Sequence, residues 1–286
     1  MVKYLFVCDN FLEDFCGGAE LSTEALINLN KENITKVKSS KIDDVFISEN
    51  EDKFWIFGNF TQISHNNILK IVKSNIKYSI VEYDLKFCKF RSPEMHRLRE
   101  HRDCDCHENN HGKLISIFFS NAESLWFMSE KQKEIYENKF NFLKGTNSFV
   151  LSSIFDIRTL NKIRNMKEIK NDKWIILNSP SWIKNKEGCV KYAKNNNLSY
   201  ELVWGLQYPE LLLKLSKSRG LIFLPLDKDT CPRIVIEAKM LDCELKINEN
   251  VLHKNEEWFC GSKDGVFNYL SSNASFFWEK LNEYSF

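Results

Sequence analysis

Short apolar runs alternate with longer segments in which apolar residues recur at helical spacing, almost from the first residue. This alternation is typical of strand–helix–strand units built around a parallel sheet. The sequence therefore predicts an α/β fold. In the first half of the chain we expect strands at residues 4–8, 53–58, 78–83, 124–128 and 148–151, and helices at 20–29, 67–73 and 130–140, the last with Ser129 as its N-cap.

The pattern restarts after a Lys- and Asn-rich interval at residues 161–172, where hydrophobicity falls. The later runs are apolar throughout, as strands covered on both faces should be. We expect strands at 174–177, 200–204, 221–224 and 244–247, and helices at 186–194, 209–217 and 233–241.

A chain of 286 residues is long enough for two modest domains. We predict an N-terminal domain over residues 1–155 and a C-terminal domain over 156–271. An aromatic-rich helical stretch near 272–286 is expected to pack back on the first domain.

Loops that follow parallel strands are the first places to search for chemistry, because ligands bind beyond the carboxyl ends of such strands. The first strand is followed by a loop in which Gly17 and Gly18 stand directly before a helix. Glycines allow close backbone approach, and a helix N-terminus offers amides to a phosphate or sugar oxygen. The alternative is a simple glycine turn, because this is not the Gly-x-Gly-x-x-Gly dinucleotide fingerprint.

A second loop follows the strand at 221–224 and carries two acids, Asp229 and Glu237, separated by seven residues. Asp229 is expected in the loop and Glu237 one turn inside a helix that starts near Pro232, with proline at N1. A buried carboxylate there is suited to accept two hydroxyls, as on a ribose. The alternative is a capping acid and a solvent-facing glutamate.

The run from Asp229 to Glu237, followed by Ala238, resembles the acid, seven-residue spacer, Glu-Ala motif of retaining GT-B glycosyltransferases of the family 4 type. Gly17 and Gly18 at the other end of the chain fit the same family in the right order. The resemblance implies two Rossmann-like domains whose parallel sheets face a central cleft. It also implies a nucleoside-diphosphate sugar as donor and no catalytic metal or other required cofactor.

The resemblance also implies roles for individual residues. Asp229 would contact the sugar, Glu237 the ribose and Lys184 the diphosphate. The sequence departs from the family at Asn178, which stands where the first of two basic residues is usual, and Lys186 or Arg233 could compensate. Further donor contacts are expected from Gly17, Gly18, Thr230, Cys231, Pro232 and Arg233.

The stretch from residue 82 to 113 is long for a loop, and such connections are usually functional. Glu82, Asp84 and His96 are candidate contacts of an acceptor. The density of cysteine and histidine also suggests structural zinc, which takes four thiolate or imidazole ligands. The candidate ligands are Cys88, Cys104, Cys106 and His107. The alternative is a loop of free thiols and solvated histidines.

Forty Lys and Arg residues against 39 Asp and Glu residues give a net charge of +1, so nucleic acid is not an expected partner. Neither a signal peptide nor an apolar run of membrane-spanning length is apparent. Nine cysteines without a secretory signal suit a reducing compartment. We therefore expect a cytoplasmic protein without a transmembrane segment.

The leading hypothesis is a retaining hexosyltransferase that moves a sugar from a nucleoside-diphosphate sugar to an acceptor hydroxyl. The acceptor is open among a glycan, a lipid-linked sugar, a protein and a modified base. One alternative is a catalytically silent GT-B-like protein that binds a sugar nucleotide or a partner. A zinc-dependent nucleic-acid module is a third possibility.

Overall fold

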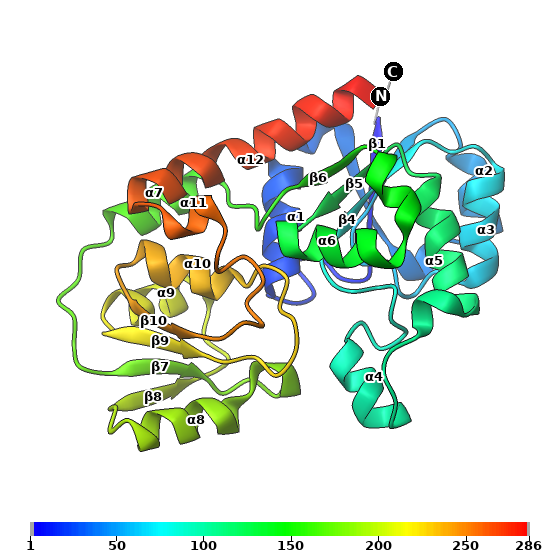
Figure 1. Ribbon diagram of the computed structural model, residues 1–286. Coiled ribbons are helices and arrows are strands. Elements are labelled where there is room, and N and C mark those ends of the chain that lie inside the picture. The colour runs from blue at the N-terminus through cyan, green and yellow to red at the C-terminus, as the bar shows by residue number, and fades with distance from the viewer. Residues whose placement is uncertain (1–2, 285–286) are drawn as a thin grey trace. The chain divides into compact units, whose positions relative to one another are not determined.

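The computed structural model describes residues 3–284 and divides the chain into two compact units (Figure 1). One unit comprises Met1–Ile154 together with Ser272–Phe286, and the other comprises Phe155–Ser271. Both are α/β units with parallel sheets. The predicted fold class is therefore confirmed at the level of each unit.

The first unit is built on a six-stranded parallel sheet with the order β2-β1-β3-β4-β5-β6. Its strands are β1 Tyr4–Cys8, β2 Ile34–Lys38, β3 Phe54–Phe57, β4 Tyr78–Glu82, β5 Ser124–Phe127 and β6 Ser148–Val150. Its helices are α1 Gly18–Asn28, α2 Asp44–Glu49, α3 His65–Lys73, α4 Pro93–Glu100, α5 Asn110–Ser120 and α6 Glu130–Lys139, with short 3-10 turns η1 Lys31–Asn33, η2 Ser39–Lys41, η3 Cys106–Glu108 and η4 Asn141–Gly145.

Aromatic side chains fill the core of the first unit. Tyr78 of β4 stacks on Phe118 of α5 with ring centroids 4.7 Å apart, and its hydroxyl donates to the Phe118 carbonyl oxygen at 2.7 Å. The C-terminal helix also packs here. The indole Nε1 of Trp278 donates to the Leu26 carbonyl at 2.9 Å, and Asn273 Nδ2 donates to the Leu151 carbonyl at 2.8 Å.

The second unit contains a four-stranded parallel sheet with the order β10-β9-β7-β8. Its strands are β7 Trp174–Leu177, β8 Tyr200–Val203, β9 Gly220–Phe223 and β10 Glu244–Ile247. Its helices are α7 Ile157–Asn165, η5 Trp182–Lys184, α8 Lys186–Asn195, α9 Tyr208–Ser216, α10 Arg233–Met240 and α11 Glu257–Cys260, and α12 Lys263–Tyr284 begins in this unit and ends in the first.

Most expected elements coincide with observed ones, and the differences have local causes. Ser129 caps α6 by accepting from the Gln132 amide at 3.2 Å, as expected. Pro232 is the N-cap of α10 rather than its first residue. Strand β2 was not expected, because three of the five residues of this edge strand are polar and it forms no apolar run. Residues 1–2 and 285–286, which bear on the expected absence of a signal peptide and on the expected final helix, lie outside the described residues.

Among residues 3–284, none of the helices is both long and apolar enough to cross a membrane.

Candidate functional site

Each of the two sheets has a point where the chain changes its direction of winding. In the first unit β1 lies between β2 and β3, and in the second β7 lies between β8 and β9. In open parallel sheets the crevice beyond the carboxyl ends of the strands at such a switch point is the usual ligand site. Charged side chains gather at both positions.

At the switch point of the second unit, Lys184 and Asp229 form an ion pair. Lys184 ends η5, which follows β7, and Asp229 lies in the loop that follows β9. The Lys184 Nζ atom is 2.6 Å from Asp229 Oδ2. The side chains are 28% and 13% exposed, so a ligand can reach the pair. The two predicted residues are thus brought together across the switch point.

The backbone around this pair is fixed from both sides. The Leu226 amide donates to the Ile183 carbonyl at 2.9 Å, which joins the loops after β9 and β7. On the other side the Asp229 amide donates to the Asn250 carbonyl at 2.7 Å. The position of Asp229 is therefore set by main-chain bonds and does not depend on its ion pair.

Glu237 lies on α10 and is buried, which excludes the alternative of a solvent-facing glutamate. Its Oε1 accepts a hydrogen bond from the Tyr208 hydroxyl at 2.8 Å and lies 3.4 Å from Arg233 Nε. Burial raises the pKa of Glu237, and the positive charge of Arg233 opposes this rise. Tyr208 was not predicted, although it begins α9 directly after the loop that follows β8, where ligands bind.

The other expected donor contacts fall into two groups. Thr230, Cys231 and Pro232 are buried and lead directly into α10, whose first turn has no side-chain cap bond. Lys186 instead pairs with Glu187 at 3.4 Å, and Asn178 is exposed after β7.

Arg233 was expected to be able to supply the cation that is missing at Asn178. Its guanidinium instead lies 3.7 Å from the centre of the Phe155 ring, and one of its terminal nitrogens is 3.3 Å from the Tyr208 hydroxyl. With its contact to Glu237, Arg233 is engaged inside the second unit. Lys184 is consequently the better placed cation.

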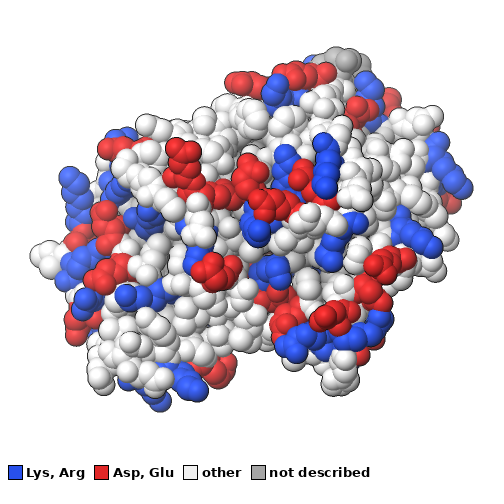
Figure 2. Space-filling model, in the orientation of Figure 1, with Lys and Arg blue, Asp and Glu red and all other residues white. Residues whose placement is uncertain are grey.

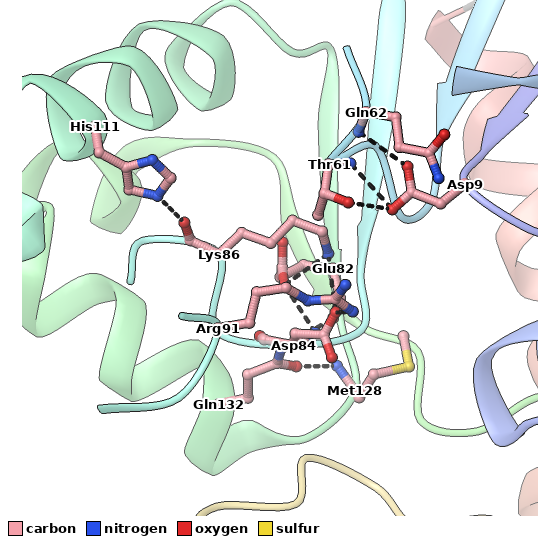
Figure 3. A network of polar contacts seen from close by, with 10 residues as sticks. All are labelled: Asp9, Thr61, Gln62, Glu82, Asp84, Lys86, Arg91, His111, Met128 and Gln132. Atoms are coloured by element: carbon pink, nitrogen blue, oxygen red, sulfur yellow. Dashed lines mark hydrogen bonds and ion pairs between the residues drawn. The ribbon is translucent and has the colours of Figure 1, made fainter. Parts of the chain in front are cut away.

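The first switch point is organised by Asp9, which follows β1 (Figure 3). Its carboxylate accepts from the Thr61 amide at 3.1 Å, the Thr61 hydroxyl at 2.7 Å and the Gln62 amide at 3.2 Å. It also accepts from the hydroxyl of Ser39, the residue that follows β2. Asp9 therefore ties together the chain after three neighbouring strands.

A second cluster lies at the end of β4 and in the loop after it, and contains the predicted residues Glu82 and Asp84 (Figure 3). Lys86 Nζ lies 3.1 Å from Glu82 and 3.5 Å from Asp84, and Arg91 also pairs with Asp84. Burial raises the pKa of Glu82, against the effect of Lys86. Burial acts on Asp84 in the same direction, but the charges of Lys86 and Arg91 outweigh it and lower the pKa of Asp84. Lys86 and Arg91 were not predicted.

His96, the third expected acceptor contact, is fully buried on α4. Its side chain lies against Cys106 and Asp105 and is therefore not presented to solvent. The sulfur atoms of Cys88, Cys104 and Cys106 lie within 4.8 Å of one another. His107 is not part of that group, and its Nε2 is 3.5 Å from Glu108. The structure therefore groups His96, and not the expected His107, with Cys106.

Gly17 is the N-cap of α1 and Gly18 its first residue, so the helix begins two residues earlier than expected. Gly17 has an ordinary φ of −117°. A Cβ there would lie 2.4 Å from a carboxylate oxygen of Glu20 and 2.7 Å from the ring of Phe15. Both neighbours are flexible side-chain ends, so close packing against them does not by itself explain the glycine.

No family model matches the sequence, and a search of curated proteins finds no match. Solved structures do resemble it. A trehalose-6-phosphate synthase has a TM-score of 0.59 at 8% identity, covering 95% of this chain and 91% of that one. A glycosyltransferase involved in avilamycin A biosynthesis has a TM-score of 0.57 at 7% identity, covering 99% and 98%.

An α-glucosyltransferase in complex with UDP and a 13-mer DNA containing a HMU base has a TM-score of 0.51 at 10% identity, covering 95% and 90% of the two chains. At these identities the likeness concerns the fold. The described units share the α/β architecture of GT-B glycosyltransferases, with a parallel sheet in each.

Proposed function

We propose that this protein is a retaining hexosyltransferase, which moves a sugar from a nucleoside-diphosphate sugar to an acceptor hydroxyl. The observation that carries the proposal is the Lys184–Asp229 ion pair at the switch point of the second sheet. A GT-B fold alone does not assign an activity. At the usual ligand position, however, this protein has an accessible cation for the diphosphate of a donor and an accessible carboxylate for the hydroxyls of its sugar.

Donor binding would exchange the partners of this ion pair. Lys184 would turn to the diphosphate, where it stabilises the charge that develops as the leaving group departs. Asp229 would then accept hydrogen bonds from hydroxyls of the transferred sugar. Because the Asp229 backbone is held independently, the residue would stay at the switch point when Lys184 leaves.

The remaining donor contacts follow from α10. Its N-cap is Pro232, whose side chain makes no capping bond, and helix N-termini are usual binding positions for phosphate or sugar oxygens. Glu237 would accept the ribose hydroxyls, in competition with the hydroxyl of Tyr208. Gly17 and Gly18, at the start of α1, are further candidates for a phosphate or sugar oxygen.

In the transfer step the bond between the anomeric carbon and the diphosphate oxygen breaks, and a bond to the acceptor oxygen forms on the same face of the sugar. The acceptor proton passes to the departing phosphate, and in this proposal no metal takes part. The protein supplies position and charge. Asp84 remains a candidate for the acceptor side, since its side chain is 28% exposed, whereas Glu82 is buried beneath it.

We favour a saccharide hydroxyl over nucleic acid as the acceptor. Figure 2 shows acidic and basic side chains interspersed over the face that it draws, and the net charge is +1. A phosphate backbone is normally met by a field of one sign. One similar structure is nevertheless a DNA complex, so hydroxymethylated DNA belongs in the acceptor panel. The described cysteines are free thiols, which suits a cytoplasmic enzyme.

The test is release of nucleoside diphosphate over a panel of donors, each with saccharide, glycolipid and DNA acceptors. Binding of nucleoside diphosphates is measured in parallel by calorimetry. Saturable binding without release from any pair would instead favour a silent sugar-nucleotide-binding protein. The anomeric configuration of the product, determined by NMR, tests retention directly.

A further inference from the structure

The segment between β4 and α5 packs into the core through Leu85 and Phe87, but its helix α4 is poorly held by apolar packing. Helix α4 has eight residues, and the buried one among them is His96. A helix this short is marginal without tertiary contacts. The ion pairs made by residues of α4, such as Lys89–Glu100 and Arg97–Glu94, are partly exposed and contribute little. Its position therefore calls for another source of stabilisation.

Three thiols from two ends of this segment converge. Cys88 precedes α4, whereas Cys104 and Cys106 follow it, and their sulfur atoms lie within 4.8 Å of one another. Cys106 also shares a second group of the same size with His96 and Asp105. Cys106 thus links two groups, one that contains the thiols of Cys88 and Cys104 and one that contains His96 of the helix.

The imidazole of His96 is oriented as a metal ligand would be. Its Nδ1 lies 3.3 Å from the Arg102 carbonyl oxygen, a contact in which Nδ1 carries the proton and donates. The lone pair is then on Nε2, which is buried, has no hydrogen-bond partner among residues 3–284 and lies 3.8 Å from Asp105 Oδ1. An unsatisfied buried nitrogen is destabilising. A backbone acceptor for the other ring nitrogen is typical of metal-bound histidine.

We propose that Cys88, Cys104, Cys106 and His96 bind one structural Zn²⁺. Three thiolates and one imidazole form a closed tetrahedral set, and sulfur-rich tetrahedral sites favour zinc. At zinc–sulfur distances of about 2.3 Å the sulfurs would stand roughly 3.8 Å apart, so the cluster contracts slightly on binding. Each thiol loses its proton to solvent as its bond to the metal forms.

Two neighbouring residues stay outside this ligand set. Asp105 pairs with Arg102 through its other oxygen, which leaves it beside the metal. His107 lies next to Glu108, outside both groups of converging atoms. The segment also carries Asp84 and Arg91, so the ion would fix the part of the first unit that bears the acceptor-side candidate.

The first test is the metal content of untagged protein, purified from zinc-supplemented medium without chelators. We expect one zinc per chain by mass spectrometry. Cys88→Ser and His96→Ala should each lose most of it. Cys260→Ser, at an exposed cysteine, and His107→Ala should keep it. Fewer than about 0.1 zinc per chain in the wild type would overturn the site, and loss in His107→Ala with retention in His96→Ala would overturn the ligand assignment.

A second test does not depend on the variants folding. Cobalt-substituted wild-type protein should show the visible bands of tetrahedral cobalt and a thiolate charge-transfer band. Removing the metal by chelation should increase hydrogen exchange in α4 while leaving α10 unchanged. Octahedral cobalt spectra, or exchange in α4 that is unaffected by complete chelation, would contradict a structural tetrahedral site. Neither readout depends on sugar transfer.

Discussion

The charged cluster at the end of β4 and the ion pair at the switch point of the second sheet both lie at the carboxyl ends of parallel strands but are built differently. In the first unit, Glu82 and Lys86 are 0% and 3% exposed, and Lys86 also contacts Asp84. In the second unit, the Lys184–Asp229 pair is accessible and its acid is held by the backbone. The first cluster is engaged in holding its own loops. The second can exchange its partners for a ligand.

This difference predicts opposite consequences of mutation. Removing one member of a buried pair leaves an uncompensated charge, which is strongly destabilising. Removing one member of a partly exposed pair changes stability little, but removes a charge that a ligand would use. We therefore expect mutations in the buried cluster of the first unit to reduce stability, and mutations of the ion pair in the second unit to reduce turnover.

The largest effect is expected for Lys86→Met. Glu82 would remain buried without its cation, and we expect a loss of about 3 kcal/mol or more in the free energy of unfolding at neutral pH. Urea denaturation measures this loss. In the double variant Lys86→Met/Glu82→Gln the buried charge is gone, so most of the stability should return. A double variant no more stable than the single one would show that Lys86 acts by packing.

The same variant has a predictable pH dependence. The pKa of Glu82 is raised by burial in the folded protein, and loss of Lys86 would raise it further. A carboxyl group with a raised folded pKa destabilises the fold above that pKa, and the penalty disappears as the pH falls below the unfolded value. The deficit of Lys86→Met relative to wild type should therefore shrink as the pH is lowered from 8 toward about 5.

Asp229→Asn should instead reduce turnover strongly and change stability little. We expect turnover to fall by about 100-fold because the sugar contact and the ordered lysine are lost, with a stability change below about 1 kcal/mol. Release of nucleoside diphosphate and urea denaturation measure the two effects. The matched control is Lys214→Met, which breaks the Lys214–Glu201 pair of the same unit at 2.8 Å without touching the loops after β7 and β9. Equal losses of turnover in both variants would refute the assignment.

The sequence was sufficient to place most strands, since the observed ends differ by at most one residue from those expected. Strands covered on both faces appear as apolar runs, and that pattern is local. Edge strand β2 lacks it, because the solvent on one side permits Thr35, Lys36 and Lys38 among its residues. Helix α4 lacks an apolar stripe altogether, since its buried residue is a histidine.

The sequence predicted the candidate site only in part. The spacing of Asp229 and Glu237 indicated their type of site, but the pairing of Asp229 with Lys184 depends on how β7 and β9 lie side by side. Lys86 carries no signal in the sequence, because its burial follows from the path of the chain after β4. The density of cysteine and histidine indicated a possible ligand set that included His107, whereas the fold brings His96 close to Cys106.

A smaller effect is expected for Glu237→Gln. Ribose hydroxyls would lose a charged acceptor, and we expect nucleoside diphosphate to bind about tenfold more weakly by calorimetry. Because burial raises the pKa of Glu237, the wild-type affinity should fall at a higher pH than for an ordinary glutamate as the pH is lowered. In Glu237→Gln this carboxyl group is absent, so the pH dependence of the affinity should reflect only the titration of the nucleotide. Parallel pH profiles for both proteins would argue against a ribose contact.

The smallest effect is expected for Tyr208→Phe, which separates two roles of the Tyr208 hydroxyl. That hydroxyl donates to Glu237 Oε1, the oxygen that also faces Arg233. If it merely occupies the carboxylate until a ribose arrives, its removal should tighten nucleoside diphosphate binding by about threefold or less, since a modest competing hydrogen bond is lost. The Tyr208→Phe/Glu237→Gln double variant should then bind no more tightly than Glu237→Gln alone, because the acceptor for which they compete has changed. Weaker binding in Tyr208→Phe would mean instead that the phenol orients Glu237. The Glu237 site would then resemble the cluster at the end of β4, whose charged residues hold one another in place.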